Sequence, residues 1–285
     1  WSAADQRARG FLVGATAGRT TLNGEGLQHA DGHSPLLAST NPACRVYDPS
    51  FAYEVAVLFE HGLRTMYGDD PDDVFFYFTV YNEARPQPPM PPDLDPRAIV
   101  DGIHCCAPAR DEPGAVQLLA SGSATALALE AKELLRDDFD VDASVWSVPG
   151  WVELARDGME CDRRDLFDPL DPRAPAGERR TPNVVRALSS TTGPFVGVTD
   201  YVRAVPELIR PWLRRRYVTL GTDGFGMSDT RARLRRHFVI DAPSIVVAAL
   251  NALAADGAVE RAVVQRAIET YSGHAERGGV VLDLV

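Results

Sequence analysis

The sequence of 285 residues contains a single lysine, Lys132, although lysine and arginine together number 29. Lysine chemistry such as Schiff-base formation therefore has one candidate, and the surrounding pattern predicts that Lys132 lies on the surface of a helix. The basic residues are outnumbered by 40 acidic residues, which gives a net charge of −11. This balance argues against a nucleic acid or an anionic membrane surface as the main partner, because both require a positive field.

Cysteines and long apolar runs are also scarce. The four cysteines are Cys44, Cys105, Cys106 and Cys161, and no two of them form a CxxC pair. Adjacent cysteines are poorly placed for a mutual disulfide, so we expect the reduced thiols of a cytoplasmic protein. The longest apolar stretch, residues 245–255, is too short to span a bilayer, and the polar opening WSAADQRARG does not resemble a signal peptide. We therefore expect no membrane partner.

The first 83 residues alternate strand, helix and strand. An apolar run at 11–18 predicts a buried strand, and a helical spacing of apolar residues predicts a helix over 49–67 with Asp48 as its N-cap. The run VFFYFTVY at 74–81 predicts a second buried strand. Between the first strand and the helix, residues 19–42 are polar and rich in glycine, which predicts a long ordered loop of the kind that carries function. This order is typical of a parallel α/β sheet.

Six prolines within residues 84–97 predict a stiff linker, and a second α/β unit is expected over 98–285. Its predicted strands are 115–123, 143–148, 184–190, 194–200 and 217–226, its predicted helices are 124–136, 151–157, 205–213, 243–255 and 259–271, and residues 160–182 are predicted to be loop. The fold class is therefore α/β, with residues 1–83 and 98–285 as separate domains.

The segment NGEGLQHADGHS, residues 23–34, gathers several proton-handling groups between glycines. Glu25, His29, Asp31 and His33 lie within nine residues of one another. Three interpretations are open: an acid/base and substrate-binding loop, a metal site built on the two histidines, or a surface loop whose side chains bind its own backbone. The spacing of four residues between the histidines suits zinc on a helix, but Gly26 and Gly32 disfavour a helix here, so no metal site is predicted.

Three long motifs resolve this choice by resemblance. The sequences TTLNGEGLQHADGHS, TNPACRVYDPSFAYEVAVLFEHGLRTMYG and LGTDGFGMSDTRARLRRHF occur in this order along the chain. Together they resemble the homodimeric-type pyruvate dehydrogenase decarboxylating component, a transketolase-like thiamine diphosphate enzyme. Because the first residue is Trp1 and not methionine, we expect the chain to be the C-terminal portion of such a protein.

The resemblance implies a domain organisation and a set of partners. Residues 1–83 resemble the latter part of the middle, pyrimidine-binding domain, residues 84–97 the linker, and residues 98–285 the C-terminal transketolase-like domain. The implied cofactors are thiamine diphosphate and Mg²⁺, with their main binding residues and the activating glutamate upstream of this chain. The implied reaction is the decarboxylation of pyruvate, followed by reductive acetylation of the lipoyl group of a dihydrolipoamide acetyltransferase. A homodimer is implied for the whole protein.

The resemblance also assigns roles within the loop. His29 matches the family histidine that lies near the substrate, where an imidazole can donate or accept a proton near neutral pH. Asp31 is expected to contact substrate or brace the loop, while Asn23, Glu25 and His33 are expected to support it. No cofactor-binding or metal-binding residue is assigned within the chain. The family commonly has HSH at the position of His33-Ser34-Pro35, so we expect the proline to stiffen the loop.

Two other functions stay open at this stage. The chain could be a non-catalytic dimerisation or interaction fragment, or part of another transketolase-like enzyme. As an isolated fragment it is expected to be inactive. We also expect residues 1–83 to expose apolar surface, because part of their sheet would be missing.

Overall fold

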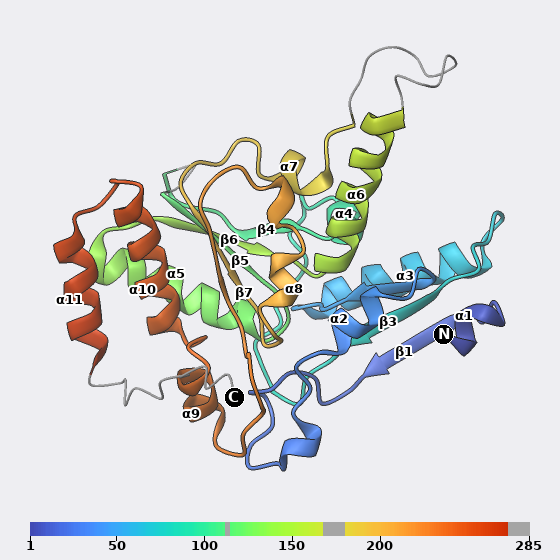
Figure 1. The fold of residues 1–285 in the computed structure, drawn as a ribbon, viewed down its shortest axis with the longest axis horizontal. Helices are drawn as coiled ribbons and strands as arrows, with labels where there is room; N and C mark the ends of the chain where they lie inside the picture. The colour runs from blue at the N-terminus through green and yellow to red at the C-terminus, as the bar shows by residue number, and fades with distance from the viewer. Residues whose placement is uncertain (112–114, 168–179, 273–285) are drawn as a thin grey trace.

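The computed structural model describes residues 1–111, 115–167 and 180–272, and it contains two sheets flanked by helices (Figure 1). The elements are α1 (Ser2–Asp5), β1 (Gly10–Gly14), η1 (Leu27–His29), α2 (Ser34–Ser39), β2 (Cys44–Tyr47), α3 (Ala52–Tyr67), β3 (Phe75–Thr79), α4 (Pro96–Val100), β4 (His104–Ala107), β5 (Val116–Ala120), α5 (Ala124–Phe139), β6 (Ala143–Ser147), α6 (Trp151–Phe167), α7 (Asn183–Ala187), β7 (Phe195–Val198), α8 (Ala204–Glu207), η3 (Arg210–Trp212), β8 (Tyr217–Leu220), α9 (Arg231–His237), α10 (Ala242–Ala255) and α11 (Arg261–Ser272).

The first sheet has three parallel strands in the order β1-β3-β2, which confirms the predicted strand at 74–81. Phe76 and Phe78 of the central strand β3 pack against α3, whose predicted existence is also confirmed. The helix begins at Ala52, because the Glu54 carboxylate accepts from the backbone amides of Ser50 and Phe51 and so caps its first turn.

Two predictions for the residues between β1 and α3 are wrong. Asp48 is not the N-cap of α3; it is buried and accepts from Thr79, Tyr81 and Ser121 instead. The loop predicted over 19–42 also contains η1 and α2. Pro35 lies in the first turn of α2, where its missing amide leaves no bond unmade, so the proline helps to begin a helix.

Strand β1 is an edge strand, and this decides its exposure. It pairs with β3 alone, and its Leu12 and Val13 side chains are 54% and 57% exposed. The expectation of a buried strand is therefore wrong, whereas the expected apolar surface on residues 1–83 is confirmed. Other large exposed apolar side chains in this region belong to Trp1, Leu27, Leu37, Phe59, Leu63 and Tyr67.

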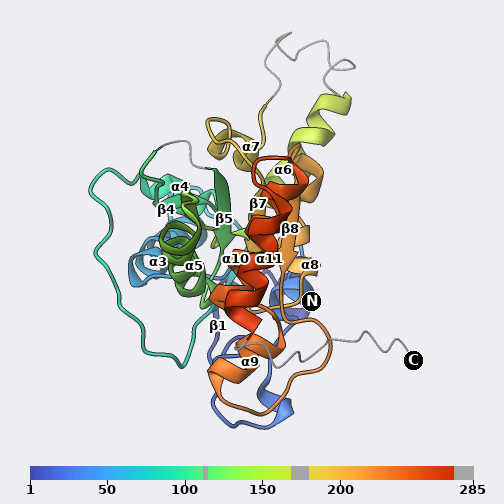
Figure 2. The same ribbon diagram turned by 90° about the vertical axis from the view of Figure 1, so that its left-hand side faces the viewer.

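The second sheet has the order β4-β6-β5-β7-β8, and only β4 runs antiparallel to its neighbour. Side chains alternate between its two faces: Leu118 of β5 joins a core with α5 and α10, while Leu119 joins a core with α6 and α8. Helices thus cover both faces (Figures 1 and 2). The predicted α/β class, with a mainly parallel second sheet, is confirmed.

One described stretch, Arg231–Ala255, is apolar and long enough to cross a membrane by length and composition. It comprises α9 and α10, and half of its apolar window is buried inside the protein. Helix α10 packs against α5, α11 and β7, and this core position accounts for its composition.

Three predictions for the helices and loops around the second sheet are wrong. Residues 184–190, predicted to be a strand, begin with helix α7, because Val184 and Leu188 are four residues apart and buried on one face. Helix α6 extends to Phe167 through residues predicted to be loop, and the rest of that predicted loop includes residues 168–179, which lie outside the described residues. Lys132 is buried, not exposed: its ammonium group donates to the carbonyls of Ala107 and Pro108.

A buried polar network joins the helix α3 layer to the second sheet. Glu54 on α3 lies 2.7 Å from His104 Nε2 on β4 and accepts from Ser147 Oγ on β6 at 2.6 Å. Ser50 Oγ lies 2.6 Å from Thr125 Oγ1 at the start of α5. All five side chains are buried, so these bonds form without competition from water and fix one layer against the other.

Candidate active site

The loop of residues 23–34 lies beside the segment that joins β8 to α9 (Figure 1). Gly24 N donates to Asp229 O at 3.0 Å, and Asn23 Oδ1 accepts from Arg231 N at the same distance. Asn23 therefore connects the loop to the N-terminus of α9. The two residues that make this contact are more than 200 positions apart in the sequence.

His29 ends the short helix η1 and extends its side chain toward solvent. Its Nε2 lies 4.0 Å from Glu25 Oε2, and both side chains are 53% exposed. At that exposure the pair adds little to stability, because water screens it. The arrangement leaves an imidazole able to meet a substrate, with one carboxylate beside it to favour a particular ring orientation.

Asp31 and His33 have structural contacts. Asp31 Oδ1 accepts from the backbone amides of His33 and Ser34, at 3.1 and 3.0 Å, just where α2 begins. His33 Nδ1 lies 3.3 Å from a terminal nitrogen of Arg19. Of the five residues singled out in the sequence, the structure pairs His29 with Glu25, whereas Asn23, Asp31 and His33 bind the scaffold around them.

Replacing Asp31 with alanine is expected to lower the free energy of unfolding of the chain by about 1 kcal/mol, because two backbone amides at the start of α2 lose their side-chain acceptor. Urea denaturation followed by circular dichroism measures this change. Asp93→Ala, at an exposed position outside the regular elements, is the matched control. An Asp31→Ala midpoint equal to that of the control would show that the two amide bonds contribute nothing.

Arg19 is a central residue that the sequence argument missed. Although almost fully buried, its guanidinium group donates to the carbonyls of Thr222 and Gly224, the latter at 2.6 Å. Burial lowers the pKa of this group, while Asp31, Asp200 and Asp223 act in the opposite direction. The two carbonyls that it binds lie more than 200 residues away, so no local sequence pattern marks this residue.

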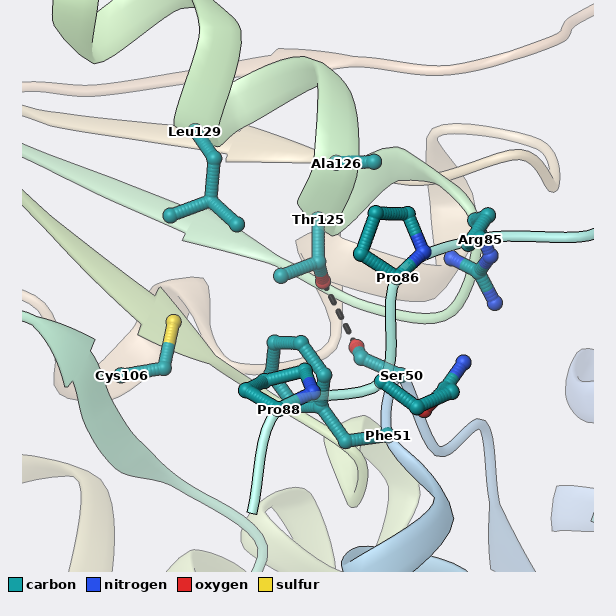
Figure 3. A pocket seen from close by; sticks show the side chains of 10 residues that line it. Ser50, Phe51, Arg85, Pro86, Pro88, Cys106, Thr125, Ala126 and Leu129 are labelled. Carbon is teal, nitrogen blue, oxygen red and sulfur yellow. Dashed lines mark hydrogen bonds between the residues drawn. The ribbon is translucent and has the colours of Figure 1, made fainter. Parts of the chain in front are cut away.

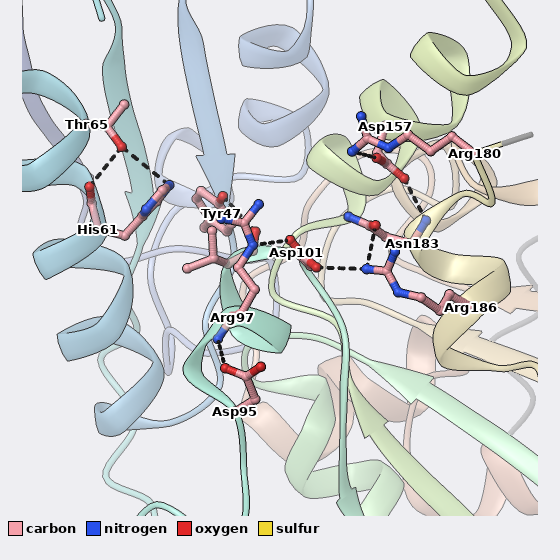
Figure 4. Close-up of polar contacts among 11 residues, drawn as sticks. Tyr47, His61, Thr65, Asp95, Arg97, Asp101, Asp157, Arg180, Asn183 and Arg186 are labelled. Carbon is pink, nitrogen blue, oxygen red and sulfur yellow. Dashed lines mark hydrogen bonds and ion pairs between the residues drawn. The ribbon is translucent and has the colours of Figure 1, made fainter. Parts of the chain in front are cut away.

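The two larger cavities of the described residues lie away from the loop, as does a smaller one of about 400 Å³, and none is lined by any of the five predicted residues. The two larger ones differ in their lining. One of about 510 Å³ separates the proline-rich segment from the start of α5, with Ser50 and Thr125 joined on its wall (Figure 3). The other, of about 610 Å³, is lined by charged side chains that are already paired, such as Arg97 with Asp101 at 2.8 Å (Figure 4).

The donors around the loop do not fit a diphosphate and its metal ion. Across residues 1–111, 115–167 and 180–272, no group of three or more histidine, cysteine, aspartate and glutamate side chains is arranged to hold a metal. The GTDGFG turn beside the loop points two carbonyls at Arg19, an arrangement that favours a cation over a phosphate.

The fold defines the class of protein. The structure matches the transketolase of Leishmania mexicana with a TM-score of 0.56 at 17% identity, over 88% of this chain and 31% of that one. The transketolase of Campylobacter jejuni gives 0.59 at 16% identity, over 87% and 32%. A split-gene transketolase, described as an inactive beta4 tetramer, gives 0.57 at 17% identity, over 86% and 67%. The fold is therefore transketolase-like.

Sequence comparison gives the family within that class. Residues 1–88 match the pyruvate dehydrogenase E1 component middle domain, and residues 102–241 match the transketolase-like TK C-terminal domain. The pyruvate dehydrogenase E1 components of Mycolicibacterium smegmatis, Mycobacterium tuberculosis and Escherichia coli K12 are 55%, 53% and 44% identical over 95%, 95% and 97% of this chain. The chain belongs to the pyruvate dehydrogenase E1 component family, and it spans about 30% of the length of these relatives.

Proposed function

We propose that the whole protein to which this chain belongs decarboxylates pyruvate and passes the acetyl unit to the lipoyl group of a dihydrolipoamide acetyltransferase. The observation that carries this proposal is the exposed imidazole of His29, held on a braced loop in a chain of this family. Bound thiamine diphosphate would supply the electron sink for loss of CO₂. We propose that the upstream part of the protein holds it with Mg²⁺, and that the protein is a cytoplasmic homodimer.

The residues of this chain act on the substrate side. His29 would donate or accept a proton at the substrate, with Glu25 orienting its ring. Asn23, Asp31 and His33 would hold the loop, through Arg231, the start of α2 and Arg19 respectively. Residues 1–83 would complete the middle domain, residues 84–97 would link it to the C-terminal domain, and residues 98–285 would form that domain.

The test is to express the full reading frame that contains this chain and to measure CO₂ release from pyruvate. We expect release that depends on thiamine diphosphate, and reduction of a lipoyl domain in the same mixture. A full-length protein that binds the cofactor but leaves pyruvate intact would contradict the proposal. Activity toward sugar phosphates in that protein would support another transketolase-like enzyme instead.

A second candidate is a non-catalytic oligomerisation module. The observation that favours it is the exposed apolar surface of β1 and α3, which includes Leu12, Val13, Phe59 and Leu63. Sedimentation of the isolated chain separates the two candidates when it is combined with the activity of the full protein. A stable oligomer of the chain, together with an inactive full-length protein, would favour the module.

A further inference from the structure

The turn that follows β7 holds both ends of the candidate loop. The Asp200 carbonyl accepts from Arg19 N at 3.3 Å, and its carboxylate accepts from Thr20 N at 3.2 and 3.3 Å. Two residues later, Val202 N donates to Gly32 O at 3.0 Å. The chain between Thr20 and Gly32, which includes His29, is therefore attached at its two ends to Asp200 and Val202.

The Asp200 carboxylate has a closely defined place in this turn. It is fully buried and also accepts from Ser123 Oγ at 3.1 Å. Gly18 packs directly on it: a Cβ at Gly18 would overlap Asp200 Oδ2, and the backbone there has φ +79°, which glycine adopts readily. Movement of the carboxylate would therefore move the backbone of residues 18–20.

Arg19 connects the backbone of residues 18–20 to the rest of the site. From the backbone fixed by Asp200, its guanidinium group reaches the carbonyls of Thr222 and Gly224 and lies beside His33. A Cβ at Gly32 would overlap the same guanidinium group, so Arg19 also packs on the far end of the loop. One buried side chain thus contacts both the loop and the turn beside it.

We propose that Asp200 is a positioning residue: by holding the backbone at Thr20 it sets the place of Arg19 and of the loop that carries His29. The kinetic part of this inference rests on the proposed function, whereas the structural part does not. Asp200 is suited to this role because it lies at the carboxyl end of a parallel strand, where α/β proteins gather the groups that serve their sites.

The charges around Asp200 come from several elements. Arg19 faces it from the root of the loop, Arg235 from α9 and Tyr81 from the end of the first sheet, while Ser123 and Thr20 donate hydrogen bonds. Burial raises the pKa of Asp200 to about 7, because these partners offset only part of the lost hydration. The carboxylate therefore changes its charge within the range where such an enzyme is assayed.

The sign of the stability effect follows from this raised pKa. An unfolded aspartate loses its proton near pH 4, so between about pH 4 and pH 7 the folded protein binds the extra proton. Stability from Asp200 is therefore greatest below pH 4 and is lost as the pH rises through 7. Asp200→Asn cannot ionise, so its stability relative to the wild type should be greater at pH 8 than at pH 5.

The experiment uses the full-length protein with Asp200→Ala and Asp200→Asn. Alanine removes the acceptor of Thr20 N and is expected to lower kcat for pyruvate about 10-fold or more through misplacement of the loop, with little change in KM. Asparagine keeps an acceptor oxygen but carries no charge, so it should match the wild-type activity measured below pH 7. The rise in kcat that we expect near pH 7 from ionisation of Asp200 should be missing from this variant. Asp256→Asn, which alters a surface carboxylate paired with Arg216, is the control.

Hydrogen exchange of residues 20–34 gives a measurement that does not depend on activity. We expect faster exchange in Asp200→Ala than in the wild type or in Asp256→Asn. Unchanged exchange and kcat in Asp200→Ala would overturn the proposal, as would a wild-type pH profile in Asp200→Asn. If the alanine variant does not fold, the asparagine pH profile decides. A wild-type protein inactive on pyruvate would refute the proposed function, and the exchange data would still decide the positioning role.

Discussion

Replacing His29 with alanine is expected to lower kcat for pyruvate decarboxylation by the full-length protein about 100-fold or more, the scale of a lost proton-transfer group. The effect should fall on kcat and kcat/KM alike, because the imidazole would act on the reacting groups and not on substrate binding alone. Steady-state CO₂ release measures both constants. The structure supports this expectation with an exposed ring beside a single carboxylate, on a loop tied at both ends.

His33→Ala is the matched control, since the two histidines lie in one loop four residues apart. His33 contacts Arg19, so its loss should loosen the loop and reduce kcat less than the loss of His29 does. Equal rates for His29→Ala and the wild type would remove His29 from the mechanism. A larger loss at His33 than at His29 would reverse their proposed roles.

The second large effect is expected on stability. Glu54→Ala should lower the free energy of unfolding by about 3–5 kcal/mol, because it removes one partner from a buried polar network. Four donors lose their acceptor at once: the amides of Ser50 and Phe51, the Ser147 hydroxyl and the His104 ring. No water reaches these groups to replace the carboxylate.

Urea denaturation of the Glu54→Ala and Glu60→Ala chains makes the comparison. Glu60 lies on the same helix, is exposed and pairs with Arg64 at the surface, so its loss should leave the midpoint nearly unchanged. Glu54→Gln, which keeps one acceptor oxygen, should lie between Glu54→Ala and the wild type. Similar midpoints for Glu54→Ala and Glu60→Ala would show that the network does not hold the layers together.

Elements with a strong apolar pattern were predicted well. The run VFFYFTVY predicts β3, and the helical spacings predict α3, α10 and α11, because burial of one face or of the whole element selects these residues directly. The strand predicted at residues 184–190 is wrong, since a short apolar run fits a strand and a helix equally well. The predicted surface position of Lys132 is wrong, because no local sequence pattern indicates that its ammonium group donates to the carbonyls of Ala107 and Pro108.

The sequence by itself determined the family, the α/β class and the segment that carries His29, because these depend on motifs and periodicities read along the chain. It did not determine what holds that segment. The loop and the turns around it depend on hydrogen bonds of Asp200, Arg19 and Asp48 to residues that are more than 30 and up to 205 positions away in the sequence. These three side chains matter because they are buried near the carboxyl ends of the strands. Only the tertiary structure brings such groups out of water and into contact, so only it could identify Asp200 as the residue that sets the loop.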